Sequence, residues 1–366
     1  MDLALKYGNE VGAPTFTAIN HLMNALAMKR LGKNEEALNQ LQKGSLIALE
    51  TKSKLLQFGS LLIQSYFAFD RGEEASGLRY LNMAFALGKD QRVFNTDFDY
   101  PSFAAMLCAK ALEAGIEVEY VQEMIRKRNL IPDKGSFQLE NWPWPLKIYT
   151  FGRFGILKFE KPIRFSRKAQ EKPLSMFKVL IALGGREVRE EDLADILWPE
   201  ADGDAAHNSF ETTLHRLRLL IGYSEVLQFH DGRLTLDSRY CWVDIWAFER
   251  LLGEVDGKGW IEDSIPLAQK AIGMYRGTFH RGTFLAKEIE HPWLISIRER
   301  FRSKFLRSLN QLDDYWCQTK QWGKALECFQ KGLEVDDLAE EFCQGVMMCY
   351  QNLGLEANAL TQYNRF

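Results

Sequence analysis

The sequence lacks any apolar run approaching the roughly 18–20 residues that a membrane-spanning helix needs. Its first residues, MDLALKYGNEVGAP, lack the basic start and apolar core of a signal peptide. A large excess of one sign of charge is also missing: the net charge is −3 over 366 residues and the pI is about 6.2. We therefore expect a cytoplasmic protein without a membrane partner, and the overall charge gives no sign of a nucleic-acid partner.

Motifs of catalysis and metal binding are also absent from the sequence. It contains no GxSxG, no HExxH, no GxGxxG and no P-loop of the form GxxxxGK[ST]. The six cysteines form no CxxC pair, which predicts reduced thiols rather than disulfides or a metal site. We expect no enzyme, no catalytic residue, no cofactor and no metal.

The N-terminal part has the pattern of paired amphipathic helices. The predicted pairs, separated by glycines, are 20–31 with 34–49, 55–70 with 73–87, and 103–114 with 118–128. Their spacing of about 40 residues resembles tetratricopeptide (TPR) repeats, whose period is about 34. We predict TPR-like helical repeats over residues 1–130. Prolines and a glycine then predict an interdomain linker over residues 131–145.

Residues 146–239 show a different order of strands, three helices and a β-hairpin. Aromatic residues favour strands within 147–164. Helices are predicted from Pro173 to a stop at the pair Gly184-Gly185, over 190–198, and over 205–221 with Asp204 as its N-cap. Two short strands, 226–230 and 233–236, flank Asp231-Gly232, the signature of a two-residue turn. This is the order of a winged helix-turn-helix, whose third helix reads the DNA major groove.

The predicted third helix has an apolar and a polar face. Its core stripe consists of Phe210, Leu214, Leu217 and Ile221. The opposite face carries side chains able to hydrogen-bond base edges, namely Asn208, Ser209, Thr212, His215 and Arg216. Side chains predicted to contact phosphates, or to act from the hairpin wing, are Arg167, Lys168, Lys172, Arg218, His230 and Arg233. The pattern alone leaves open a structural α+β insert whose polar helix face is merely solvated.

Charge is distributed unevenly within this region. Between residues 164 and 178 there are five basic residues and one acid, Glu171. Residues 187–204 instead hold eight acids and one base, Arg189. The region is therefore polarised rather than basic, and we expect the acidic segment to face away from DNA or towards a protein partner.

The C-terminal part is helical again. Predicted helices cover 244–252, 261–275, 293–320, 322–334, 339–354 and 355 to the end. Ala325 and Ala359 are 34 residues apart, as are Phe329 and Tyr363, which matches the TPR period. Two copies of RGTF, at 276–279 and 281–284, are expected in a loop between helices. The fold class predicted for the whole chain is mainly α, with TPR-like repeats flanking a winged helix-turn-helix.

Several segments resemble one family of bacterial regulators. LIALGGREVREEDLADILWPEADGDAAHNSFETTLHRLRLLIG (180–222) looks like the OmpR-like winged helix of SARP-type transcriptional activators. VDIWAFERLL, YRGTF, WLISIRERFRSKFLRSL and WGKALECFQKGLEVDDLAEE are similar to the bacterial transcriptional activator domain that follows it. VQEMIRKRNLIP followed by WPWPLKIYTFGRFG resembles the repeat region of STAND regulators of the maltose-activator type. The resemblance implies a DNA-binding winged helix over 146–239 and an activator domain, truncated at its C-terminus, over 240–366. It also implies that the chain is the C-terminal part of a longer regulator.

The function implied by this resemblance is sequence-specific, DNA-binding transcriptional activation at the bacterial nucleoid. The expected partners are double-stranded promoter DNA, RNA polymerase subunits and a second copy bound to direct repeats. Asn208 and His215 stand where related winged helices often carry Arg, so fewer phosphate contacts and a shallower salt dependence are expected. Arg189 stands where the family often has a Ser helix cap. The alternative, favoured by the acidic face, is a helical-repeat scaffold whose winged helix binds protein rather than DNA.

Overall fold

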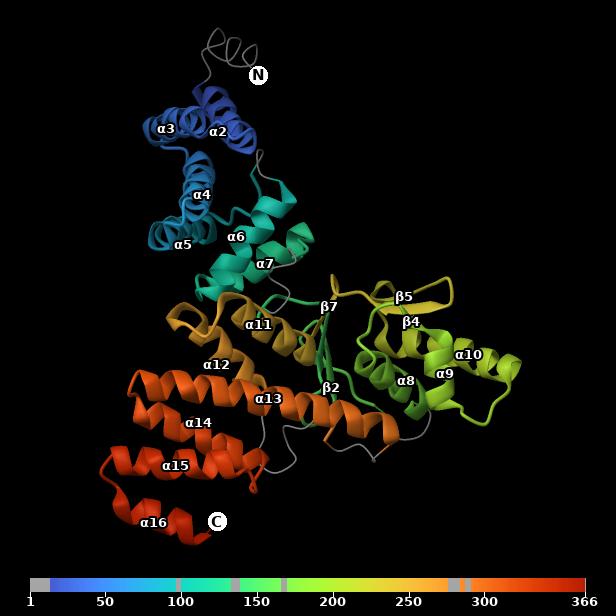
Figure 1. The fold of residues 1–366 in the computed structure, drawn as a ribbon. Coiled ribbons are helices and arrows are strands. Elements are labelled where there is room, and N and C mark those ends of the chain that lie inside the picture. Colours follow the sequence, from blue (N-terminus) through green and yellow to red (C-terminus); the bar gives the residue numbers. More distant parts are fainter. Residues whose placement is uncertain are drawn as a thin grey trace. The chain divides into compact units, whose positions relative to one another are not determined.

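The computed structural model describes residues 14–96, 100–132, 139–165, 170–275, 284–286 and 291–365. The chain divides into two compact units, Met1–Pro143 and Trp144–Phe366. As predicted, the fold is mainly α, and the second unit contains two small sheets (Figure 1). No helix within the described ranges is long and apolar enough to cross a membrane. All six cysteines are free thiols.

The first unit consists of antiparallel helix pairs at the predicted positions. Its helices are α2 (Pro14–Arg30), α3 (Asn34–Glu50), α4 (Lys54–Asp70), α5 (Glu74–Gln91), α6 (Pro101–Glu113) and α7 (Val118–Arg128). Local capping explains one of the starts, because the Ser53 hydroxyl accepts a hydrogen bond from the Leu56 amide. Residues 139–143 of the predicted linker belong to this unit: Asn141 donates to the Leu112 carbonyl at 2.9 Å, and Trp142 is buried.

The second unit begins with a four-stranded sheet. Its strands are β1 (Leu146–Tyr149), β2 (Gly155–Lys158), β3 (Lys161–Pro162) and β7 (Cys241–Val243), in the order β3-β2-β1-β7. β1 is antiparallel to β2 and parallel to β7, with Ile148 opposite Val243. β7 was not predicted, and it pairs with β1 from just beyond the predicted boundary between residues 239 and 240. The two predicted domains on either side of that boundary therefore share one sheet.

Three helices and a second sheet follow this first sheet. The helices are α8 (Glu171–Ala182), α9 (Glu190–Leu197) and α10 (Gly203–Ile221), and the sheet has the order β4 (Val188–Arg189), β6 (Arg233–Leu236), β5 (Leu227–His230). Their common core contains Phe177, Leu193, Leu214 and Leu234. The prediction of Asp204 as the N-cap of the third helix is wrong. Asp202 caps α10, because its Oδ1 accepts from the Ala205 amide at 2.9 Å, whereas Asp204 lies in the first turn.

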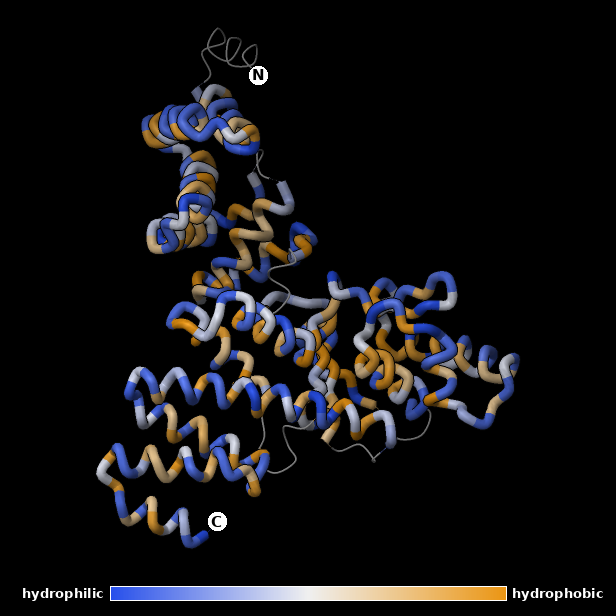
Figure 2. The backbone as a smooth tube through the Cα atoms, in the orientation of Figure 1, coloured by the Kyte–Doolittle hydropathy of each residue, from blue (hydrophilic) through white to orange (hydrophobic). Residues whose placement is uncertain are grey.

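The remaining helices stack as successive neighbours. They are α11 (Asp244–Lys258), α12 (Ile265–Met274), α13 (Pro292–Gln318), α14 (Trp322–Val335), α15 (Glu340–Asn352) and α16 (Glu356–Arg365), with short 3₁₀ turns η2 (Ser224–Val226) and η3 (Glu262–Ser264). Hydrophobic and hydrophilic residues alternate along them, as amphipathic helices require (Figure 2). Close packing needs small residues, and a Cβ on Gly332 would lie 2.4 Å from the Phe342 ring. The RGTF segments lie outside the described residues, apart from Phe284.

A buried carboxylate joins the four-stranded sheet to α11. Asp244 accepts from the Thr150 amide at 2.6 Å, from the Thr150 hydroxyl at 2.5 Å and from the Phe151 amide at 2.8 Å. Burial raises the pKa of Asp244 to about 6, although these hydrogen bonds favour the ionised form. Phe151 is thereby held in an aromatic cluster with Phe248, Tyr275 and Phe301. The strands and the C-terminal helices thus share one core.

A second joint lies at the end of α8. Gly185 has a φ of +73°, which favours glycine, and a Cβ there would lie 2.3 Å from Trp246 of α11. The Gly185 carbonyl accepts from the Leu236 amide at 2.7 Å, which ties the same turn to β6. The glycine pair predicted to stop the helix thus also provides space for α11.

Removing the Asp244 carboxylate is expected to destabilise the second unit. Asp244→Ala leaves the buried Thr150 and Phe151 amides without an acceptor, at a cost of about 2–4 kcal/mol. Chemical denaturation of the full chain measures this loss. Asp256→Ala, which removes an exposed acid from the same helix, is the control and should change stability by less than about 0.5 kcal/mol. Equal effects of the two changes would contradict the assigned role.

A second buried acid makes stability depend on pH. Asp313 of α13 is 1% exposed, and within the described residues neither carboxyl oxygen has a nitrogen or oxygen hydrogen-bond partner. Burial, together with the neighbouring Asp314 carboxylate, raises the pKa of Asp313 to about 8. The folded state therefore holds a proton that the unfolded chain releases near pH ~4. The stability that this proton contributes is complete at low pH and is lost as pH rises through about 8.

Asp313→Asn should remove this pH dependence, because an amide has a similar shape and does not ionise. The free energy of unfolding of the parent is expected to fall relative to that of Asp313→Asn as the pH rises from about 4 to about 8, and to change little at higher pH. Urea titrations at several pH values measure the difference. A difference that stays constant over this range would show that the buried carboxyl does not titrate there.

Candidate nucleic-acid interface

The polar face predicted on the third helix is the outward face of α10. The side of the helix that packs into the core carries Phe210, Thr213, Leu214, Leu217 and Ile221. Of the five predicted base-reading residues, Asn208, Thr212, His215 and Arg216 are exposed, and Ser209 is half-buried at the edge of the face. Four of the five side chains are therefore free to meet a ligand laid along α10.

One residue at the middle of this face was not predicted. Leu219 is 69% exposed and stands nine residues after Phe210, about two and a half helical turns. It therefore faces directly away from the core. The helical periodicity could have found it, but the prediction considered only polar side chains as base readers.

The hairpin predicted as a wing is present. β5 and β6 are antiparallel with His230 opposite Arg233, and both residues are exposed. Asp231 and Gly232 have φ values of 49° and 67°, the geometry of a type I′ turn, which explains the Asp-Gly sequence. Arg233 donates to the Glu187 carbonyl at 3.3 Å, so part of its hydrogen-bonding capacity is already used within the sheet.

The start of α9 connects the hairpin to α10. The Glu190 amide donates to the Gly232 carbonyl at 2.9 Å, and the Glu190 carboxylate contacts His207 Nδ1 at 2.6 Å. His207 lies in the first turns of α10, so one residue holds both the hairpin turn and the helix. An open pocket with a volume of about 650 Å³ lies between the hairpin turn, α9 and the start of α10. Its lining includes Arg189, Glu190, His207 and Arg233. Neither Glu190 nor His207 was predicted, because residues 17 apart show no local pattern.

Two of the cations predicted to contact phosphates already bind backbone carbonyls of the protein. Lys172 donates to the Leu197 carbonyl at the end of α9 at 2.9 Å, and Arg218 donates to the Leu227 carbonyl at 3.1 Å. Both charges therefore satisfy backbone acceptors of the protein itself. Lys158, which was not predicted, donates to the Gly222 carbonyl at the end of α10 at 2.6 Å. Arg167 and Lys168 lie outside the described residues.

Three of the eight acids of the segment 187–204 lie in the first turn of α9. Arg189 stands at the N-cap position of α9 and makes no capping hydrogen bond with its side chain, which is the absence expected for Arg in place of Ser. Its guanidinium instead donates two hydrogen bonds, of 2.8 and 3.1 Å, to the Asp192 carboxylate. The first turn carries Glu190, Glu191 and Asp192, whose charges suit the positive end of the helix dipole. The acids of α9 thus have a local structural role, and Glu191 remains exposed.

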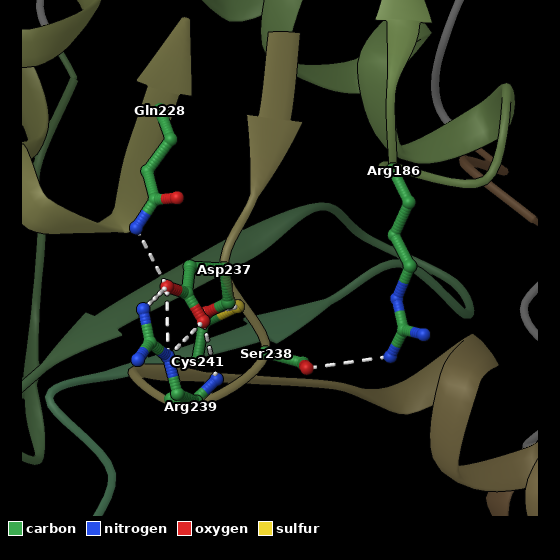
Figure 3. A network of polar contacts seen from close by, with 6 residues as sticks. All are labelled: Arg186, Gln228, Asp237, Ser238, Arg239 and Cys241. Atoms are coloured by element: carbon green, nitrogen blue, oxygen red, sulfur yellow. Dashed lines mark hydrogen bonds and ion pairs between the residues drawn. The ribbon is translucent and has the colours of Figure 1, made fainter. Parts of the chain in front are cut away.

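A polar network fixes the base of the hairpin (Figure 3). Asp237 accepts from Gln228 Nε2 at 2.8 Å and from Arg239 Nη2 at 2.6 Å, and its backbone carbonyl accepts from the Cys241 thiol. Burial disfavours the ionised carboxyl, but the Arg239 hydrogen bonds outweigh it and lower the pKa of Asp237. Arg186 lies apart from this pair and donates to Ser238 Oγ at 3.3 Å. The segment between β6 and β7 is therefore held to both sheets.

The described residues contain no cluster of three or more His, Cys, Asp or Glu side chains able to hold a metal ion.

Changing Glu190 should alter the titration of His207. The hydrogen bond and charge of Glu190 raise the pKa of His207 above its ordinary value. The protonated ring therefore stabilises the folded state below about pH 6.5, and this contribution is lost as pH rises through the folded-state pKa. In Glu190→Gln we expect the pKa of His207 to fall, as measured by NMR of its ring protons. Glu191→Gln is the control, and an equal fall there would contradict the assignment.

The comparisons with known proteins concern mainly the C-terminal part of the chain. Residues 243–366 match the family model described as Bacterial transcriptional activator domain. No curated protein gives a significant match. A similar solved structure is Mycobacterium tuberculosis EmbR in complex with a low affinity phosphopeptide, with a TM-score of 0.47 and 16% identity over 61% of this chain and 59% of that chain. This chain thus spans less than two thirds of the EmbR chain.

Two further structures align with most of the chain at low TM-scores. The TPR domain of P58(IPK) has a TM-score of 0.22 and 10% identity, over 95% of this chain and 82% of that chain. The human IFIT1 dimer with m7Gppp-AAAA has a TM-score of 0.18 and 15% identity, over 95% of this chain and 67% of that chain. The domain match coincides with the helices that begin at α11. The chain therefore carries a bacterial transcriptional activator domain over residues 243–366.

Proposed function

We propose that this chain is a sequence-specific DNA-binding transcriptional activator. Residues 146–239 act as an OmpR-like winged helix, and α10 reads the major groove of double-stranded promoter DNA. The observation that carries the proposal is the outward face of α10. Asn208, Thr212, His215 and Arg216 are exposed there, and within the described part of the chain no side-chain hydrogen bond or ion pair occupies them. The covalent continuation into an activator domain supports the same function.

The chemistry of these side chains suits base edges. Arg216 can donate two hydrogen bonds to guanine, and Asn208 can pair with the donor and acceptor of adenine. Thr212 and His215 can bond bases or phosphates. Few cations lie on this face, so the affinity should depend less steeply on salt than that of more basic winged helices.

The hairpin supplies the second contact. His230 and Arg233 are exposed beside the turn, and an arginine at a wing fits the negative potential of a narrow minor groove. The Glu190 contacts hold the turn and the start of α10 together, which supports simultaneous contact with adjacent grooves. Lys172 and Arg218 enter the proposal as weaker phosphate contacts, since each already binds a backbone carbonyl. We keep Arg167 and Lys168 as proposed phosphate contacts.

The helical repeats serve protein contacts in this proposal. The activator domain, α11 to α16, would contact RNA polymerase subunits or a neighbouring copy on direct repeats, and the N-terminal helix pairs would receive the regulatory signal. Action at bacterial promoters places the protein in the cytoplasm at the nucleoid. We also propose that the chain is the output end of a longer regulator.

The exposed carboxylates of α9 favour a second candidate. Glu191 and Asp195 are exposed, and they suit a basic protein surface better than DNA. In this alternative the chain is a helical-repeat scaffold. Selection of bound fragments from genomic DNA by the purified chain separates the two. Enrichment of a common sequence supports DNA reading, and absence of any enriched fragment supports the scaffold.

Arg216→Ala should weaken binding to the selected DNA by about 1–3 kcal/mol and relax the preference at one base pair. Fluorescence anisotropy at fixed salt measures both effects. Arg307→Ala, which removes an exposed arginine from α13 of the activator domain, is the matched control and should leave the affinity unchanged. If Arg216→Ala folds and binds like the parent, α10 is not the reading helix.

A further inference from the structure

An apolar side chain ends the polar face of α10. Leu219 is the most exposed large hydrophobic residue among the described residues of 144–286, and the larger side chains that precede it along the same line of the helix, Asn208, Thr212 and His215, are polar. A single exposed leucine is ordinary on a protein surface. The position of Leu219 is what matters, because it lies diametrically opposite Phe210 and so at the point that would enter a groove most deeply.

The spacing along the helix places Leu219 in line with the proposed base readers. Asn208, Thr212, His215 and Leu219 follow one another at intervals of four, three and four residues, which keeps them on one line of the helix. Leu219 lies seven residues after Thr212, about 10 Å along the axis, which corresponds to about three base pairs. It lies one turn beyond Arg216, and so about one base pair from the base that Arg216 contacts.

The floor of the major groove offers one apolar group, the 5-methyl of thymine. The geometry points to Leu219 as a specificity-determining residue that packs on a thymine methyl next to the base read by Arg216. This inference rests on the proposed DNA-binding function. The polar neighbours hydrogen-bond base edges, and Leu219 selects a base through the methyl group alone. Contact with a cytosine or guanine edge would instead bury the leucine against polar atoms without a hydrogen bond.

The local structure holds Leu219 in this position. The preceding and following core residues, Leu217 and Ile221, are buried and anchor the last turn of α10. Gly222 ends the helix, and Lys158 binds its carbonyl, so the turn that carries Leu219 is closed by two groups of the protein. Because the backbone of this turn is held, binding has to order only the leucine side chain itself, which favours discrimination by a single methyl group.

The test removes the methyl group from the DNA and the side chain from the protein. In the DNA selected by the full chain, each thymine is replaced in turn by deoxyuridine, which lacks only the 5-methyl. Affinities are measured for the parent, Leu219→Ala, Leu219→Met and Leu183→Ala, the last removing an exposed leucine from the end of α8. Retained circular dichroism and melting temperature establish that each variant is folded.

We expect one position at which uracil weakens binding by the parent about fourfold, the effect of one buried methyl group. Leu219→Ala should bind the thymine DNA about fourfold more weakly and show no further loss with uracil at that position. Leu219→Met should keep the methyl effect, and Leu183→Ala should behave as the parent.

The inference is overturned if Leu219→Ala keeps the full methyl effect, or if no thymine position shows one. It is also overturned if Leu219→Ala binds DNA normally but loses association with a protein partner, since Leu219 is then a protein contact. In each of these outcomes Arg216→Ala still weakens binding and the proposed function stands. If the parent binds no DNA fragment, the proposed function itself fails.

Discussion

The second unit depends on one buried carboxylate. Asp244 begins α11 directly after β7, and it holds the Thr150 and Phe151 amides at the end of β1. Because β1 also pairs with β7, the chain cannot change this strand pairing without leaving a buried acid or a buried amide unpaired. Phe151 is thereby positioned against Phe248 and Phe301. The strands, the three-helix region and the activator domain consequently form one packed body rather than separate modules.

This construction gives α10 a firm support. Its inner face is fixed by core residues, its start is capped by Asp202, and its end is closed by Gly222 and Lys158. Glu190 ties the first turns to the hairpin through its amide and its carboxylate. The outward line of polar side chains, which ends in Leu219, makes none of these contacts. Four of the eight acids of the segment 187–204 lie on α9, and the three in its first turn suit the helix start, where Asp192 binds Arg189 and Glu190 binds His207.

Most helices could be predicted because their signals are local. Apolar periodicity, helix stops at glycines and the Asp231-Gly232 turn set the element order, and the helices and the hairpin occur where they were expected. The elements that escaped prediction, β4 and β7, contain two and three residues and exist only because a distant strand pairs with them. The cap of α10 was assigned to Asp204 instead of Asp202, since two acids within three residues offer the same local signal.

The sequence by itself determined the mainly α fold, the order of the elements and the polar stripe of α10, because each depends on residues within a few turns of one another. The tertiary structure alone decided which of the candidate side chains are free. Lys172 and Arg218 are cations in the sequence, but backbone carbonyls 25 and 9 residues away already bind them. Glu190 and His207 likewise bind each other, in a contact between two helices, and so are not free for a ligand. Hydrogen-bond partners that are distant in sequence leave no periodic signal, so only folding reveals which charges the protein keeps for itself.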